Sequence, residues 1–236
     1  MPRHARIERW SLGESAIHRR HAAAKILATL ALLIAIATLS PGAAIACGIF
    51  FLILIVAAFA ARLPVLRMLA AAAAVLPFAL CFAAMSALTG DPARAVWLVI
   101  RAYLSSFAAL LLIATTPMPA LMRALEWLRL PRFLVEVMQI LYRYLFVLTG
   151  EALTMRQALV ARGGSVASLR FRQAAGAAGV LFARSQSRAQ AVHRAMLARG
   201  FDGRLPASAK PAFRTADAGF VFAAAAVAVA VRVVFQ

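Results

Sequence analysis

Acidic side chains are scarce in this chain: 8 Asp and Glu residues stand against 26 Lys and Arg, a formal net charge of +18. Cysteine is rarer still, and Cys47 and Cys81 stand alone in apolar stretches with no CxxC spacing. Isolated cysteines argue against a thiolate metal site or a redox motif. A P-loop, an HExxH or GxSxG motif and paired carboxylates are also missing from the sequence. We therefore expect no enzymatic activity, no metal site and no cofactor in this chain.

Apolar residues are abundant, at 64% of the chain, whereas soluble domains average about 45–50%. A membrane-spanning helix needs about 20 consecutive, mainly apolar residues. The first 25 residues are polar and basic, without the apolar core and cleavage site of a signal peptide. The sequence thus predicts an all-α polytopic membrane protein with about five transmembrane helices. These spans are expected at residues 22–40, 43–61, 68–88, 95–116 and 218–234.

Basic residues assign the two sides of the membrane, because cytoplasmic loops carry an excess of Lys and Arg. The amino-terminal segment and the "RLPVLR" loop are basic and are expected in the cytoplasm. The turns at 40–42 and 89–94 are then external, and so is the carboxyl terminus. Since the charge surrounds apolar spans and no nucleic-acid module is recognisable, nucleic acid is not expected as a partner.

The region 117–217 differs from the rest, because residues 123–214 hold 15 of the 26 basic residues. Its pattern predicts one short amphipathic helix followed by two long helices, at 133–162 and 165–199, that are too long and too charged to be ordinary spans. The small-residue run "QAAGAAGVLFA" favours a close helix crossing at Gly176 and Gly179. The expected division is 1–116 for the amino-terminal segment and four spans, 117–217 for a cytoplasmic or interfacial helical module, and 218–236 for the last span.

The two long helices end in matching sequences, "ALVARG" at 158–163 and "AMLARG" at 195–200. One interpretation is structural: glycine caps the helix and the arginine complements the helix dipole. The other is that Arg162 and Arg199 dock in acidic grooves of a partner, since a guanidinium stays charged and offers a fork of donors to carboxylates. Two equivalent arginines favour docking on a dimeric partner. Such docking requires that both helix ends lie within reach of one dimer.

The stretch "LFARSQSRAQAVHRAMLARGFDG" (181–203) resembles the T component of energy-coupling factor (ECF) transporters, most of all its CbiQ branch. The segment "ESAIHRRHAAAK" (14–25) is similar to the same branch, although the family often has a proline between the histidine and the lysine. The resemblance implies a non-catalytic coupling subunit in the bacterial inner membrane, amino terminus in the cytoplasm, which joins two cytoplasmic ATPases to a membrane-embedded substrate-binding subunit for cobalt uptake. The ATPase-docking residues that it implies are Arg162 and Arg199, with Ala161, Gly163, Ala198 and Gly200 shaping the helix ends.

Several alternatives stay open at this level. The cargo can be nickel or a vitamin instead of cobalt, and the chain can be a conventional ABC permease or a lipid-bound membrane scaffold. His18 and His21 have the i, i+3 spacing of two metal ligands, although two ligands make an incomplete site. Arg184 and Arg188, with Arg199, are also suited to anionic headgroups of membrane lipids.

Overall fold

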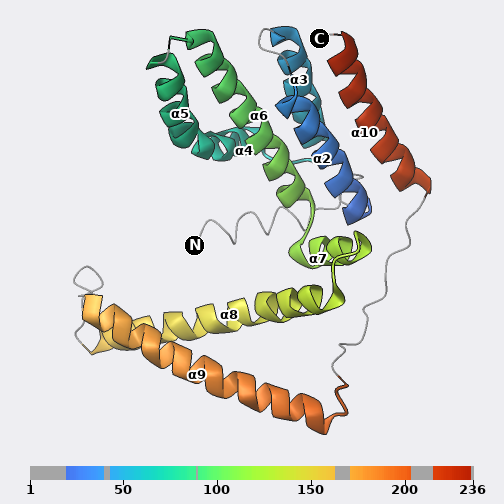
Figure 1. Ribbon diagram of the computed structural model, residues 1–236. Coiled ribbons are helices and arrows are strands. Elements are labelled where there is room, and N and C mark those ends of the chain that lie inside the picture. The colour runs from blue at the N-terminus through green and yellow to red at the C-terminus, as the bar shows by residue number, and fades with distance from the viewer. Residues whose placement is uncertain (1–19, 40–42, 89, 163–170, 203–214, 235–236) are drawn as a thin grey trace. The chain divides into compact units, whose positions relative to one another are not determined.

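The computed structural model describes residues 20–39, 43–88, 90–162, 171–202 and 215–234, and every regular element among them is a helix (Figure 1). The chain forms two compact units, and each is described by itself. The first unit consists of α2 (Ala22–Ala37), α3 (Ala44–Ala60), α4 (Val65–Ala72), the 3-10 turn η1 (Ala73–Val75), α5 (Leu76–Leu88), α6 (Pro92–Thr115), α7 (Met118–Trp127) and α10 (Thr215–Val234). The second consists of α8 (Arg132–Ala161) and α9 (Phe171–Ala198). The predicted all-α architecture is confirmed.

Four helical stretches among the described residues are long and apolar enough to cross a membrane: Val65–Leu88, Pro92–Thr115, Arg132–Ala161 and Thr215–Val234. Three of them coincide with expected spans. The first two expected spans are apolar helices of only 16 and 17 residues, α2 and α3. Contrary to the expectation that it is too charged, α8 also qualifies, because an 18-residue stretch of it carries no more than two charged residues. The cytoplasmic location of region 117–217 stays a prediction.

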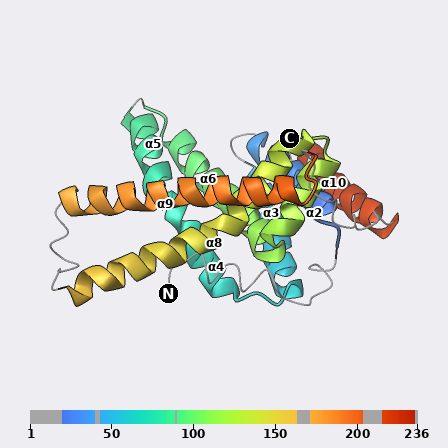
Figure 2. The ribbon, with the colours of Figure 1, turned by 90° about the horizontal axis from the view of Figure 1, so that it is seen from below.

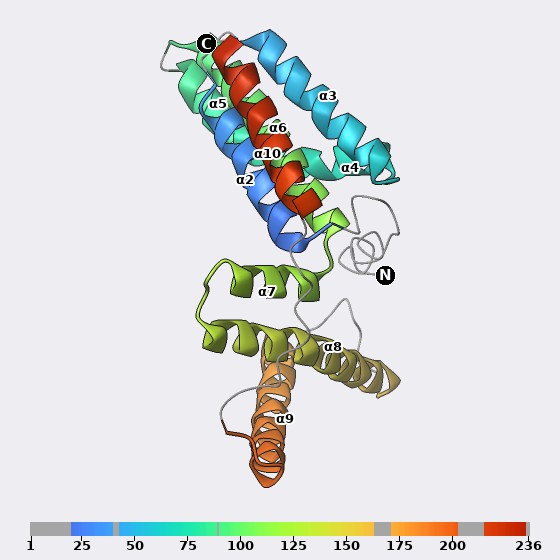
Figure 3. The same cartoon turned by 90° about the vertical axis from the view of Figure 1, so that its right-hand side faces the viewer.

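The core of the first unit is a single apolar cluster to which α2, α3, α4, α6 and α10 contribute. Its largest fully buried side chains include Phe50 of α3, Ile36 of α2 and Phe107 of α6. Lipid tails are as apolar as these side chains, so in a membrane close packing, and not removal from water, holds such helices together. Small residues serve this purpose where α2 meets α10, which lie side by side in Figure 3 and bury Ala28 and Ala228.

The third expected span is interrupted at η1 because of Pro77. A proline has no N–H for the carbonyl four residues earlier and its ring clashes with that carbonyl, here the carbonyl of Ala73, where η1 begins. Side chains of α6 bond carbonyls just before the interruption: Tyr103 Oη donates to Leu69 O (3.2 Å) and Ser106 Oγ to Ala72 O (3.3 Å). A neighbouring helix thus stabilises the bend between α4 and α5, as membrane proteins require of broken helices.

The amino-terminal ends of α2 and α10 are held together by Asp217, a buried carboxylate in the first turn of α10. Its Oδ1 accepts the backbone N–H of His21, the N-cap of α2, at 3.3 Å, and lies 3.9 Å from Arg20 Nη1. Arg20 also donates to Ala216 O at 2.9 Å. A carboxylate is favoured where helix N-termini leave N–H groups without intrahelical partners. The two helices therefore run parallel, as the predicted topology requires of the first and last spans.

The carboxyl-terminal end of α6 is capped from another helix by Lys25. Its ammonium Nζ donates to the carbonyl of Thr115, the last residue of α6, at 2.8 Å, and both residues are buried. The last four carbonyls of a helix have no intrahelical donor, and a cation complements the negative end of the dipole. Lys25 thus ties α2 to the end of α6.

We expect Lys25→Met to lower the free energy of unfolding by about 1–3 kcal/mol, because it removes a charged donor and leaves a buried carbonyl without that bond. Thermal unfolding of the detergent-solubilised chain measures the change. Arg67→Met is the matched control, since Arg67 is an exposed cation of α4. Equal unfolding midpoints for the two variants would show that the Lys25 cap contributes nothing.

Candidate docking site at two helix ends

The second unit exposes most of its surface. Among the side chains that the structure describes in α8 and α9, only that of Val135 is buried. Helices in proteins gain most of their stability by packing one face against other parts of the structure. Because α8 and α9 bury so little here, their surface is available for packing against other partners. The exposed large apolar side chains of α8 are Phe133, Leu134, Val137, Ile140, Leu141, Leu145, Phe146, Val147, Leu153 and Val160.

The end of α9 is fixed by backbone geometry. Arg199 follows the last helical residue, and Gly200 adopts φ +79°, a conformation that only glycine takes without strain. The N–H of Phe201 donates to Met196 O (3.0 Å) and the N–H of Gly200 to Leu197 O (3.0 Å). This is the Schellman pattern of bonds, which satisfies the last carbonyls and stops the helix. It leaves Ala198 and Arg199 exposed at the tip.

The end of α8 presents the same pair of residue types. Ala161 is the last helical residue and Arg162 is the C-cap, whose N–H donates to the carbonyls of Ala158 and Leu159 at 3.2 Å each. Both Ala161 and Arg162 are exposed. Gly163 lies outside the described residues. Each motif arginine is therefore placed one residue beyond its helix and not within the last turn.

An arginine at a helix end is not by itself a docking signal in this chain. Arg62 and Arg129 follow the ends of α3 and α7 and themselves adopt positive φ, +56° and +67°. The next helix begins three residues after each of them, at Val65 and Arg132. Cations at these ends are explained by the helix dipole. What sets Arg162 and Arg199 apart is that they end the two helices with the fewest buried side chains.

The two long helices meet at Glu151. Its Oε1 accepts from Arg184 Nη1 at 3.3 Å and its Oε2 from Arg188 Nη2 at 3.2 Å. In two perpendicular views the helices run at an angle to each other (Figures 1 and 2). Arg184 and Arg188, which the sequence had suggested for lipid headgroups, are thus engaged with a carboxylate.

The Glu151 contact does not lie at the glycines that the sequence indicated. Gly176 and Gly179 are exposed, and a Cβ atom built on either would meet no described neighbouring atom within 4 Å. Small residues permit close approach of two helices but do not enforce it. The observed contact at Arg184 lies more than one helical turn beyond Gly179, and a role for the glycines as a crossing point stays a prediction without support from this geometry.

The arginine tips lie on opposite sides of the contact, with α8 ending at the left of Figure 1 and α9 at the right. Arg162 is eleven residues beyond Glu151, and Arg199 is eleven beyond Arg188. At 1.5 Å per residue each arm is about 16 Å long, so the tips are separated by at most about 40 Å. A small domain is about 30 Å across. One dimer with one groove per subunit can therefore reach both tips.

Of the suggested metal pair, the structure describes His21, which caps a helix. His18 lies outside the described residues. The Nδ1 of His21 accepts the N–H of Ala23 at 3.2 Å and so caps α2, and its ring lies edge-on to Trp127, with centroids 6.2 Å apart. Within the described part of the chain, no group of three His, Cys, Asp or Glu side chains could hold a metal ion.

The sequence analysis missed the polar contacts that connect helices: Lys25 with Thr115, Asp217 with His21, and Glu151 with two arginines. For Glu151 a signal existed, because it is the sole carboxylate between residues 137 and 201. For Asp217 the signal was an acidic residue at the start of the last apolar run, the end of a helix that favours negative charge.

We expect Gly200→Ala to destabilise the end of α9 by about 1 kcal/mol, because alanine resists positive φ. Hydrogen exchange of the Gly200 and Phe201 amides measures the opening of this turn. Gly179→Ala is the matched control: this glycine is helical and has open space, so alanine should stabilise α9 by about 0.5–1 kcal/mol. If Gly179→Ala instead loosened the contact between α8 and α9, this would show that the two helices cross at the glycines.

Residues 13–209 match the family described as CbiQ, cobalt transport protein. Over 115 residues, 48% of this chain, the sequence is 33% identical to a cobalt transport protein CbiQ of Rhodobacter capsulatus. Over 90 residues, 38% of this chain, it is 31% identical to a putative fused cobalt transport protein CbiMQ of Methanocorpusculum labreanum. These matches span only 47% and 15% of the relatives' own lengths. Since the family match covers most of its residues and its helices include several long enough to span a membrane, the chain is a multi-pass membrane protein that belongs to the CbiQ family of cobalt transport proteins.

Proposed function

We propose that this chain is the transmembrane coupling subunit of an ECF-type importer, which transmits conformational change from two cytoplasmic ATPases to a membrane-embedded substrate-binding subunit. The observation that carries the proposal is the pair of exposed arginines, Arg162 and Arg199, at opposite tips of two helices joined at one crossing. Cobalt is the proposed cargo, because the matched relatives are named as cobalt transport proteins.

Each arginine tip is suited to an acidic groove on one ATPase subunit. A guanidinium pairs with a carboxylate through two parallel hydrogen bonds, which fixes orientation as well as adding affinity. Ala161 and Ala198 beside the arginines are small and exposed, so they let the helix end enter a groove. Gly200, which allows α9 to stop directly after Arg199, keeps that tip short; Gly163 has the corresponding place in sequence after Arg162.

The movement of the ATPases would reach the cargo subunit through α8 and α9. ATP binding brings the two ATPase subunits together and hydrolysis lets them separate, so the distance between their grooves changes. Helices anchored in both grooves would change their mutual angle. The exposed apolar side chains of α8, such as Phe133, Leu141 and Leu145, would then shift against the substrate-binding subunit, and membrane lipids would cover the rest.

The proposed setting is the bacterial inner membrane with the amino terminus in the cytoplasm. Two features support this orientation. Basic residues gather near the start of α2 and in the loop after α3, on the sides that the positive-inside rule assigns to the cytoplasm. The starts of α2 and α10 lie together at Asp217, so a cytoplasmic amino terminus also places the end of the 117–217 region on the cytoplasmic side. In this role the chain itself does not hydrolyse ATP.

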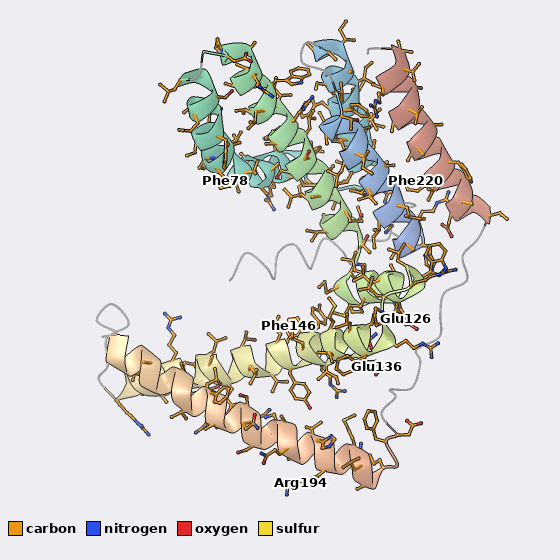
Figure 4. The ribbon with its side chains drawn as sticks, viewed as in Figure 1. Phe78, Glu126, Glu136, Phe146, Arg194 and Phe220 are labelled. Carbon is orange, nitrogen blue, oxygen red and sulfur yellow. The ribbon has the colours of Figure 1, made fainter. Side chains whose placement is uncertain are left out.

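We expect Arg162→Ala and Arg199→Ala each to weaken association with the ATPase pair by about tenfold or more, because truncation of an interface arginine leaves its carboxylate partner unpaired. Co-purification of the ATPases with the tagged chain, and Co²⁺ uptake into proteoliposomes, measure the loss. The matched controls are Arg156→Ala on α8 and Arg194→Ala on α9, both exposed. Figure 4 shows Arg194 extending from α9 on the side away from α8.

Full association and full uptake by the Arg162→Ala/Arg199→Ala double variant would refute the docking role. Purification of the wild-type chain with lipid alone would favour a membrane scaffold. Transport of Ni²⁺ or a vitamin, with Co²⁺ excluded, would keep the coupling role and change the cargo.

A further inference from the structure

Glu151 is isolated among positive charges. Residues 137–201 contain nine arginines and this single carboxylate, and α9 has no acidic residue at all. An intrahelical Glu–Arg pair is therefore absent from α9, and Glu151 is the nearest opposite charge that α8 can offer its arginines. Between residues 137 and 201 no other carboxylate can take the place of Glu151, so an ion pair between α8 and α9 in this stretch has to form at this residue.

The geometry uses both oxygens of Glu151. One accepts from Arg184 and the other from Arg188, so the carboxylate bridges two guanidinium groups that lie one helical turn apart on the same face of α9. The side chain of Glu151 is only 16% exposed, whereas those of Arg184 and Arg188 are 57% and 42% exposed. The bridge fixes which turn of α9 lies over which residue of α8.

Only half-buried apolar side chains accompany the bridge among the described residues. They are Leu148, Met155 and Leu159 on the Glu151 face of α8, and Leu181, Val192 and Met196 on α9. Exposed ion pairs contribute little to stability, so the bridge matters for geometry more than for folding energy. A narrow contact held at one carboxylate fixes a point of closest approach and leaves the angle between the helices adjustable.

We propose that Glu151 is the fulcrum of the α8–α9 pair: a positioning residue that holds the crossing point midway between the Arg162 and Arg199 tips while the angle between the helices changes. This inference rests on the proposed coupling function and adds the residue through which the two tips are connected. The arms are equal, at eleven residues from Glu151 to Arg162 and eleven from Arg188 to Arg199. With arms of about 16 Å, a rotation of about 20° moves each tip by about 5 Å.

The geometric test uses the full chain in lipid nanodiscs without partners. Spin labels at Gln157 and Ala195, both exposed and close to the tips, report the distance between the arms after Cys47 and Cys81 are changed to alanine. The labels lie about 9–10 Å along the arms, so a rotation of about 20° moves each by about 3 Å, and Glu151→Arg should broaden and shift the distance distribution by about 3 Å or more. The charge-exchanged variant Glu151→Arg/Arg184→Glu/Arg188→Glu should restore the wild-type distribution.

The matched control is Glu136→Arg, which reverses the other carboxylate of α8 and should leave the distribution unchanged. If Glu151→Arg does not fold, Glu151→Gln removes the charge with nearly the same shape and should broaden the distribution. A wild-type distribution in Glu151→Gln and Glu151→Arg, or failure of the charge exchange to restore it, would overturn the proposal.

A functional test separates positioning from docking. In proteoliposomes that contain the ATPases and the substrate-binding subunit, Glu151→Arg should lose Co²⁺ uptake while ATPase association and ATP hydrolysis remain. The charge-exchanged variant should regain uptake. Loss of ATPase association in Glu151→Arg would make Glu151 part of the docking surface and overturn the fulcrum. Failure of the wild-type chain to bind ATPases would refute the proposed function, whereas the distance measurement would still decide whether Glu151 sets the crossing.

Discussion

The first unit depends on how helix ends satisfy their backbone groups. The first N–H groups and last carbonyls of a helix have no intrahelical partner, and a membrane interior offers no water in their place. Here a side chain from another helix supplies the partner: Lys25 for the end of α6 and Asp217 for the start of α2. Tyr103 adds a second bond to a backbone carbonyl, that of Leu69, just before the proline-induced bend. Each such bond also connects two helices, so the side chains that bond backbone groups also determine which helices of the bundle lie next to each other.

The second unit follows a different rule. Its helices bury little in the part of the chain that the structure describes, and one carboxylate bridges them to each other through two arginines. With 26 basic residues and 8 acidic ones, the chain has few internal partners for its cations. The positive excess is consistent with partners that carry the complementary charge.

The two units suit two parts of one task. A bundle whose helix ends are tied across to one another can hold a fixed position in the membrane. A pair of long helices with few buried side chains in the described part of the chain can change angle without breaking many contacts. In the proposed importer the first property anchors the subunit and the second transmits movement. The family assignment agrees with this division, since the match spans both units, residues 13–209.

Reading the amino acids alone was enough to predict the helical architecture, the positions of three long spans and the end of α9. It could do so because these depend on local chemistry: runs of apolar residues, and Gly200, which takes the positive φ that stops a helix. It did not reveal the interruption at Ala73 in spite of Pro77, nor the span-like composition of α8. The place where α8 and α9 meet could be learned only from the folded chain. Gly176 and Gly179 make a close crossing sterically feasible, but which residues face one another depends on how two whole helices are oriented, and among the described residues Glu151 of α8 meets Arg184 and Arg188 of α9.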